Sequence, residues 1–124
     1  MSEPLSRKVR RGDLMAAACP SRAVLKHLTS RWAVLALIVL QDGTHRFSAL
    51  RKKIGGVSER MLAETLQALE GDGMVIRTDH HVVPPHVDYT LTSLGEEAAE
   101  KVAGLADWIE VNLPRIAKRW SKAA

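Results

Sequence analysis

Apolar residues recur every three or four positions along much of this chain, which is the period of a helix with one buried face. The pattern predicts helices over residues 21–28, 31–41, 47–54, 58–71 and 93–113. Because these segments make up most of the chain, the pattern indicates a mostly helical protein.

The starts of these helices are marked by hydroxyl side chains, which can accept a hydrogen bond from the backbone N–H groups of a first helical turn. We expect N-terminal caps at Ser21, Ser30, Ser48, Ser58, and Thr92 or Ser93. Ser93 and Glu96 also fit the spacing of a capping box. Pro20 is expected to break any helix that precedes it, and Pro114 to end or kink the last helix.

The helix over residues 58–71 has two faces of opposite character. Leu62, Leu66 and Leu69 lie at i, i+4 and i+7, which defines a buried face. The opposite face is polar, with small or flexible residues at its margins: Arg60, Glu64 and Gln67, flanked by Met61 and Ala63. A helix anchored by leucines and polar on the outside can enter a DNA major groove, which is about 12 Å wide.

Two β-like runs follow, over residues 74–78 and 87–92, and a shorter one covers residues 45–47. Pro84-Pro85 lies between the longer runs and belongs in a loop, because proline has no N–H to donate to a strand ladder. Helix, turn, helix and hairpin in this order are the parts of a winged helix-turn-helix DNA reader. We therefore expect a mostly α protein with a small β-hairpin wing (α+β), with the DNA-binding motif and wing in residues 44–92.

The chain has 124 residues and a formal charge of +4. That length suits one domain, and the basic balance favours an anionic partner. Residues 1–18 are expected to form a basic segment with a dimerisation helix, residues 93–113 a C-terminal dimerisation helix, and residues 114–124 a basic tail. Trp32 and Trp108 are expected in the core.

Cys19 is the only cysteine, so an intrachain disulfide is excluded, and a reducing cytoplasm is the expected location. The first residues lack the apolar stretch of a secretory signal. The apolar run over residues 32–40 is too short to span a bilayer, so no membrane partner is expected.

Several short segments stand in a particular order: Cys19-Pro20, Arg31-Trp32, Arg46-Phe47-Ser48-Ala49-Leu50, Ser58-Glu59-Arg60-Met61-Leu62, Leu66-Gln67-Ala68-Leu69-Glu70-Gly71-Asp72-Gly73, Val83-Pro84-Pro85-His86-Val87-Asp88-Tyr89-Thr90-Leu91-Thr92, Leu94-Gly95 and Trp108. In their order and spacing, over roughly residues 19–112, they resemble the HxlR family of bacterial transcription regulators.

The resemblance implies a homodimer that binds double-stranded DNA and pairs its subunits through terminal helices. The helix over residues 58–71 would enter the major groove, and the wing would touch the flanking minor groove. Two positions depart from the family pattern. Thr29-Ser30-Arg31 stands where the family often has Gly-Gly-Lys, and His86 replaces a usually basic residue after the wing prolines.

The candidate DNA contacts lie on the polar face of the second motif helix, on the helix before it and on the wing. Arg60 can reach a guanine edge or a phosphate, and Gln67 an adenine edge or a phosphate. Glu64 can accept from cytosine or, the favoured role, pair with Arg60 four residues before it. The further DNA-binding candidates are Ser58, Met61, Arg51, Lys52, His80, His81, Pro84 and His86. The alternative interpretation is that these side chains form an ordinary solvated surface that does not contact DNA.

The wing histidines also have a metal-ligand or pH-sensor interpretation. Neighbouring strand residues point to opposite faces, so His80 and His81 do not easily reach one ion. No cysteine or carboxylate cluster with familiar zinc spacing accompanies them. We therefore assign His80, His81 and His86 to DNA contact, and expect no metal and no cofactor.

Cys19 precedes Pro20 and lies near Arg22, Lys26 and His27 in the sequence. Positive neighbours or a helix N-terminus lower the pKa of a thiol and raise its thiolate fraction. The resemblance implies a thiol sensor for an oxidant or a small electrophile. The alternative is a small buried apolar residue, which is common for a free cysteine.

The expected function is therefore a DNA-binding transcriptional repressor that responds to oxidants or electrophiles through Cys19. One alternative is the same fold with a small effector bound non-covalently at the dimer interface. Another is a winged-helix protein-interaction module that does not read DNA. An enzyme is not expected, and no catalytic residue is assigned, because no catalytic set, phosphate-binding glycine loop or metal motif is present in the sequence.

Overall fold

The computed structural model describes residues 3–13 and 19–123. Within these ranges the helices are α1 (Leu5–Arg11), α2 (Pro20–Thr29), α3 (Arg31–Leu40), α4 (Phe47–Ile54), α5 (Glu59–Gly71) and α6 (Ser93–Ala123). The strands are β1 (His45–Arg46), β2 (Val75–Asp79) and β3 (Val87–Leu91). The expected mostly helical fold with a β-hairpin wing is confirmed. Residues 14–18 of the expected N-terminal segment lie outside the described residues.

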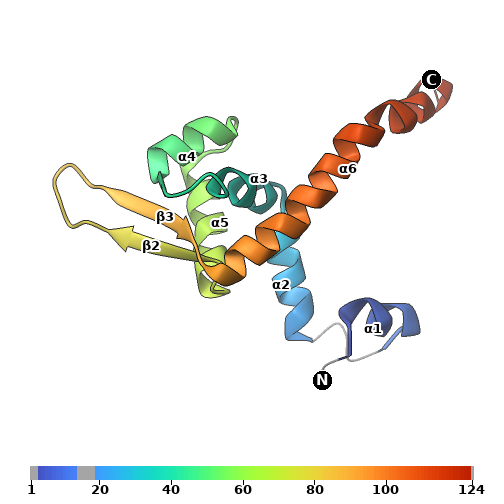
Figure 1. Cartoon of the computed structure of the whole chain (residues 1–124), viewed down its shortest axis with the longest axis horizontal. Helices are drawn as coiled ribbons and strands as arrows, with labels where there is room; N and C mark the ends of the chain where they lie inside the picture. Colours follow the sequence, from blue (N-terminus) through green and yellow to red (C-terminus); the bar gives the residue numbers. More distant parts are fainter. Residues whose placement is uncertain (1–2, 14–18, 124) are drawn as a thin grey trace.

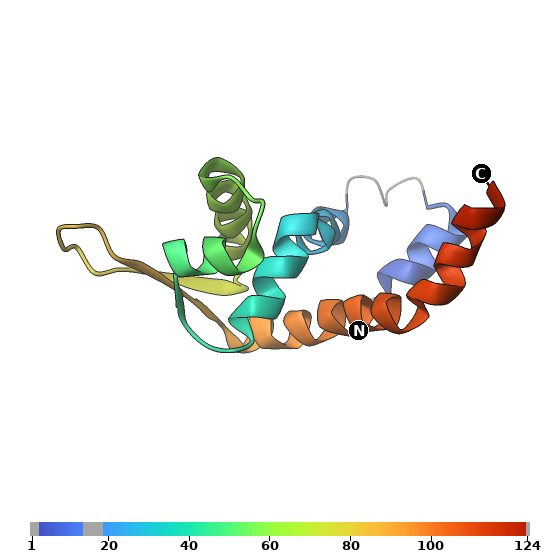
Figure 2. The ribbon, with the colours of Figure 1, turned by 90° about the horizontal axis from the view of Figure 1, so that it is seen from above.

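The three strands form one antiparallel sheet in the order β1-β3-β2. Val75 pairs with Leu91 at one end of the β2–β3 ladder, and Asp79 pairs with Val87 at the other. Strands β2 and β3 with the loop between them project from the helices as the wing, residues 75–91 (Figure 1). The end of α6 projects in the opposite direction, so the molecule is elongated (Figures 1 and 2).

The core lies where α3 meets α4, α5 and the first turns of α6 (Figure 1). Helix α3 is almost entirely apolar, and a helix of this kind must be surrounded by other elements. Its Leu37 and Leu40 pack in one cluster with Leu50 of α4 and with Ala99 of α6. The leucines Leu62, Leu66 and Leu69 of α5 complete this cluster and are fully buried.

The N-terminal cap predicted at Ser58 is confirmed, because its hydroxyl accepts a hydrogen bond from the Met61 N–H at 3.1 Å. The cap predicted at Ser21 is wrong, since α2 begins at Pro20 and Cys19 occupies the cap position. Proline suits the first position of a helix because its fixed φ is helical and its missing N–H has no partner there.

Two other caps differ from the prediction. Ser48 lies inside α4, which begins at Phe47, with Arg46 at the cap position. Ser30 stands at the cap position of α3. Its hydroxyl donates to the His27 carbonyl oxygen at 3.0 Å and does not accept from the first N–H groups of α3.

Helix α6 starts at a threonine cap and continues through a proline. The Thr92 hydroxyl accepts from the Gly95 N–H at 2.9 Å, and Ser93 is already helical, so the predicted Ser93–Glu96 capping box is wrong. The helix does not end at Pro114. Its C-terminal part, which contains Pro114, turns away from the direction of its first turns (Figure 2). The predicted basic tail over residues 114–124 is therefore helical as far as Ala123.

The last half of α6 leaves much of its apolar surface uncovered. Trp108 is 57 % exposed, and the prediction that it lies in the core is wrong for this chain alone. Trp32 is partly buried against the core, as predicted. The other exposed apolar side chains of α6 are Leu94, Leu105, Ile109, Val111, Leu113 and Trp120. The apolar period of α6 therefore continues past the part of the helix that the core covers.

Among the described residues, no single helix is long and apolar enough to cross a bilayer. The pair α2 and α3 reaches that length and composition only when the two helices are taken together, and they meet at a bend of 72°.

Gly95 is buried where α6 crosses the start of β2, and this contact gives a prediction about stability. A Cβ atom at Gly95 would lie 1.9 Å from the Met74 carbonyl oxygen, so α6 or β2 must move to accept it. We expect Gly95→Ala to lower the free energy of unfolding by about 1–3 kcal/mol. Urea denaturation measures this change. The control is Gly104→Ala on the same helix, where nothing lies within 4 Å and stability should rise by about 0.5–1 kcal/mol. Equal stability of the two variants would contradict the close approach.

Candidate nucleic-acid interface

The turn between α4 and α5 is fixed by two glycines and an arginine. Gly55 and Gly56 have φ values of +69° and +80°, which residues other than glycine rarely adopt. The Arg51 Nε donates to the Val57 carbonyl oxygen at 3.0 Å, and its guanidinium lies 3.7 Å from the Glu59 carboxylate. Arg51, a predicted DNA contact, is thus partly engaged in holding the turn. Lys52 is exposed beside it.

The outward face of α5 carries the polar side chains that were predicted from the sequence. Arg60, Met61, Glu64 and Gln67 are all exposed. The Arg60 Nε donates to the Glu64 carboxylate at 3.1 Å, which confirms the predicted ion pair. Both side chains are more than half exposed, so the pair contributes little to stability and is free to rearrange around a ligand.

A hollow of about 380 Å³ separates α5 from the wing, and Gln67 and Glu70 line it opposite Arg77 and Tyr89. A second hollow, of about 390 Å³, lies between the start of α4 and the wing and is lined by Arg46, Phe47, Ser48, Arg77, Pro85, Val87 and Tyr89. Arg77 borders both hollows and was not among the predicted contacts. Arg77 stands opposite Tyr89 in the ladder, and this pairing follows from the strand register, which no local pattern in the sequence shows.

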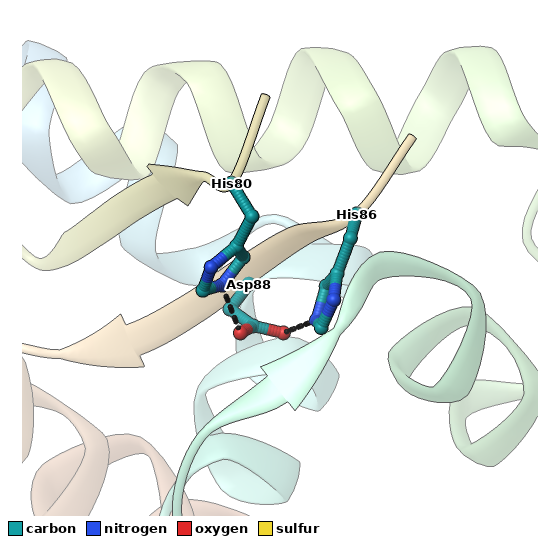
Figure 3. Close-up of side chains that lie close together, drawn as sticks. All are labelled: His80, His86 and Asp88. Carbon is teal, nitrogen blue, oxygen red and sulfur yellow. Dashed lines mark hydrogen bonds and ion pairs between the residues drawn. The ribbon is translucent and has the colours of Figure 1, made fainter. Parts of the chain in front are cut away.

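Two of the wing histidines turn towards a carboxylate. The Nε2 atom of His80 lies 2.7 Å from Asp88 Oδ2, and the Nε2 atom of His86 lies 2.9 Å from Asp88 Oδ1 (Figure 3). These hydrogen bonds, first from His80 and then from His86, hold the pKa of Asp88 below its ordinary value, and partial burial opposes them. Sequence reasoning missed Asp88, because only the strand register shows which residue faces the histidines.

The tip of the wing carries the other two predicted contacts. His81 has a φ of +52° and a side chain that is 86 % exposed, and its N–H donates to Asp79 Oδ1 at 2.8 Å. Pro84 is exposed as well. His81 and Pro84 are therefore open to solvent at the tip, while His80 and His86 lie nearer the base of the loop. The Arg46 guanidinium braces this loop by donating to the Pro85 carbonyl oxygen at 3.1 Å.

Cys19 is half-buried at the N-terminal cap of α2. A hydrogen bond from the Ser21 hydroxyl lowers the pKa of the Cys19 thiol, and the Ser21 backbone N–H acts in the same direction. The Lys8 ammonium, 3.9 Å from the sulfur, favours the thiolate further. The pKa of Cys19 is thus lowered, which is the direction predicted, but the main causes are Ser21 and Lys8. Of the predicted neighbours only Arg22 contributes, through its backbone N–H. His27 lies at the other end of α2 and pairs with the Asp72 carboxylate at 2.6 Å.

A short helix, a tight turn and a second helix with a free polar face, next to a projecting hairpin, define a winged helix-turn-helix protein. The family model for the HxlR-like helix-turn-helix matches residues 27–117, and the chain belongs to that family. This confirms the resemblance noted in the sequence. The chain is therefore a transcriptional regulator and not an enzyme.

The relatives agree with this assignment. The uncharacterized HTH-type transcriptional regulator YtfH of Escherichia coli strain K12 is 64% identical over 112 residues, which is 90% of this chain and 89% of YtfH. The solved structure of YtfH from Salmonella typhimurium is 62% identical, with a TM-score of 0.83 over 88% of this chain and 97% of that one. The redox regulator HypR in its reduced form is 31% identical, with a TM-score of 0.72 over 81% of this chain and 99% of that one.

Proposed function

We propose that this regulator is a homodimeric, sequence-specific DNA-binding repressor that reads its operator with the outward face of α5. The observation that carries the proposal is the arrangement of α5, in which three buried leucines leave Arg60 and Gln67 exposed. Hydrogen-bonding side chains on such a helix can pair with base edges in the major groove. The basic formal charge of +4 supports binding to the phosphate backbone.

Each part of the surface has a role in the proposal. Arg60 reads a guanine edge or a phosphate, and Gln67 an adenine edge. Glu64 holds the Arg60 guanidinium until DNA replaces it, and Met61 packs at the margin of the base contacts. The start of α5 at Ser58 receives a phosphate, because backbone N–H groups point outward at a helix N-terminus.

The preceding helix and the wing hold the phosphate backbone in this proposal. Lys52 is exposed and contacts phosphate, and Arg51 adds its charge while it braces the turn. On the wing, His81 and Pro84 at the exposed tip approach the flanking minor groove. His80 and His86 contribute from the base of the loop, where Asp88 engages them.

A second subunit would cover the apolar surface that α6 leaves exposed. Soluble monomers rarely expose a large continuous apolar patch, and such patches mark interaction surfaces. Helix α1 has no buried residue and stands apart from the core (Figure 1), and its Val9 is 57 % exposed. We propose that α6, with α1, pairs the two chains. This would place two α5 helices on one duplex, as dimeric helix-turn-helix proteins do.

Cys19 is proposed as the switch of this repressor. Its thiol has a lowered pKa and is partly accessible, and these are the properties of a reactive cysteine. HypR, a 31% identical protein, is described as a redox regulator. With one thiol per chain, the reversible switch that we propose is an intersubunit disulfide or an adduct with a small molecule. This chemistry suits a reducing cytoplasm, which remains the predicted location.

The DNA-binding proposal predicts a loss of affinity when the α5 face is truncated. We expect Arg60→Ala and Gln67→Ala each to cost about 1–3 kcal/mol, because one base or phosphate contact is lost. That corresponds to roughly a 5- to 150-fold rise in Kd for the DNA upstream of the gene. Gel-shift titrations at two salt concentrations measure it. Lys26→Ala, which also removes one exposed charge from a helix but lies outside both α5 and α6, is the control and should bind like wild type. Unchanged binding by both α5 variants would favour a protein-interaction module instead.

The dimer proposal predicts that a charge on the exposed face of α6 separates the subunits. Trp108→Glu would bury an unpaired carboxylate between the chains, so we expect light scattering to give the mass of a monomer. Ile76→Glu changes an exposed apolar residue of the wing in the same way and should leave the dimer intact. A wild-type protein that is monomeric at micromolar concentration would contradict the proposal.

The switch proposal predicts that diamide or a quinone releases the wild-type protein from DNA. Cys19→Ser removes the thiolate that reacts, so this variant should bind in the absence of oxidant and stay bound in its presence. Gel shifts across an oxidant titration measure both. Equal release of the two proteins at the same dose would show that Cys19 is not the sensor. A non-covalent effector at the dimer interface would then become the better explanation.

A further inference from the structure

We propose that the base of the wing binds one divalent transition-metal ion, of which Zn²⁺ is the representative. The ligands are the Nε2 atoms of His80 and His86 and the carboxylate of Asp88 (Figure 3). All three belong to one hairpin, so the inference does not depend on whether the protein binds DNA as proposed above.

The strand register brings the three side chains together. Asp79 pairs with Val87, and one step further the His80 N–H donates to the His86 carbonyl oxygen at 3.0 Å. His80 therefore stands opposite His86. His86 directly precedes β3, and Asp88 is the second residue of that strand, so the two residues are two positions apart in extended chain and project from the same face of the hairpin. The adjacent histidines His80 and His81 point to opposite faces and do not share an ion, whereas the cross-strand pair His80 and His86 lies on one face.

The distances between the ligand atoms suit a single ion. One donor atom from each residue lies within 4.8 Å of the other two, and the imidazole rings are 4.3 Å apart between centroids. Zinc bonds to nitrogen and oxygen are about 2.0–2.2 Å, so ligands in a tetrahedral site are separated by roughly 3.3–3.6 Å. Each Nε2 atom would have to move less than about 1 Å away from the carboxylate to admit an ion between them.

The donor set selects the class of metal. Imidazole nitrogens suit Zn²⁺, Ni²⁺ and Cu²⁺, whereas Mg²⁺ and Ca²⁺ prefer a shell made of oxygen ligands. Three protein ligands leave at least one coordination position for water, as in an open zinc site. A neutral imidazole binds the ion through Nε2 once its proton has moved to Nδ1 by exchange with water, so no net proton has to leave the histidine.

The neighbouring arginines contact other groups, so the Asp88 carboxylate is available to the two histidines. Arg46 stands opposite Asp88 in the ladder, but its guanidinium donates to the Pro85 carbonyl oxygen. Arg77 of β2 lies 4.0 Å from the Asp79 carboxylate. The side chains of His80, His86 and Asp88 are 41 %, 34 % and 20 % exposed, so water and ions can reach the cluster. A bound ion would add positive charge to the wing and connect β2 to β3.

The test is a zinc titration of the full-length chain after removal of metal with a chelator. All proteins carry Cys19→Ser, which excludes zinc binding by the thiol. Competition with a chromophoric zinc indicator gives the affinity and the stoichiometry. We expect one Zn²⁺ per chain, and at least an approximately tenfold weaker affinity in His80→Ala and in Asp88→Asn. His81→Ala removes the adjacent histidine that lies outside the cluster, and it should bind zinc like the parent protein.

A second measurement needs no change at the proposed ligands. In NMR spectra of the parent protein, zinc should shift the imidazole signals of His80 and His86 and leave those of His27, His45 and His81 in place. The proposal is overturned if the parent protein does not bind zinc, if His81→Ala weakens binding as much as His80→Ala, or if zinc shifts the other histidines instead.

Discussion

The burial of three leucines on one side of α5 determines what the rest of that helix can do. Leu62, Leu66 and Leu69 are fully enclosed in the cluster that α3 and α4 contribute to, so α5 cannot rotate about its axis. Arg60 and Gln67 must then face solvent. Replacing one of these leucines with alanine would cost about 2–5 kcal/mol and would also loosen the surface opposite. The stability of the domain and the geometry of the proposed DNA-reading face therefore depend on the same contacts.

Helix α2 lies between Cys19 and the C-terminal end of α5. Cys19 caps its N-terminal end, and near the other end His27 holds the carboxylate of Asp72, the residue that follows α5. The contact joins two elements that are far apart in the chain. If Cys19 is the proposed switch, a displacement of α2 would act on Asp72 through this contact. A transmitted signal needs two states of this contact, and the 2.6 Å hydrogen bond defines one of them.

The elongated shape separates two kinds of surface. One end carries the wing and the polar face of α5, and the other end is formed by the C-terminal part of α6 (Figure 1). The exposed apolar side chains of that part are Leu105, Trp108, Ile109, Val111, Leu113 and Trp120. The first is suited to a charged, hydrated partner such as DNA, and the second to an apolar partner such as another copy of the chain. The proposed metal site lies in the wing, away from the proposed subunit contact, so an ion there would change the wing without disturbing that contact.

The sequence by itself determined the order of helices and strands, the buried leucine face of α5, the Ser58 cap and the Arg60–Glu64 pair, because each depends on residues within one or two helical turns. It misplaced the start of α2, where Pro20 begins a helix instead of ending one, and it placed Trp108 in a core that does not reach it. Only the tertiary structure decided that His80 and His86 meet at Asp88, that Lys8 lies beside Cys19, and that Met74 excludes a side chain at Gly95. These contacts join residues on different elements, and their positions follow from strand register and packing, which no local pattern in the sequence contains.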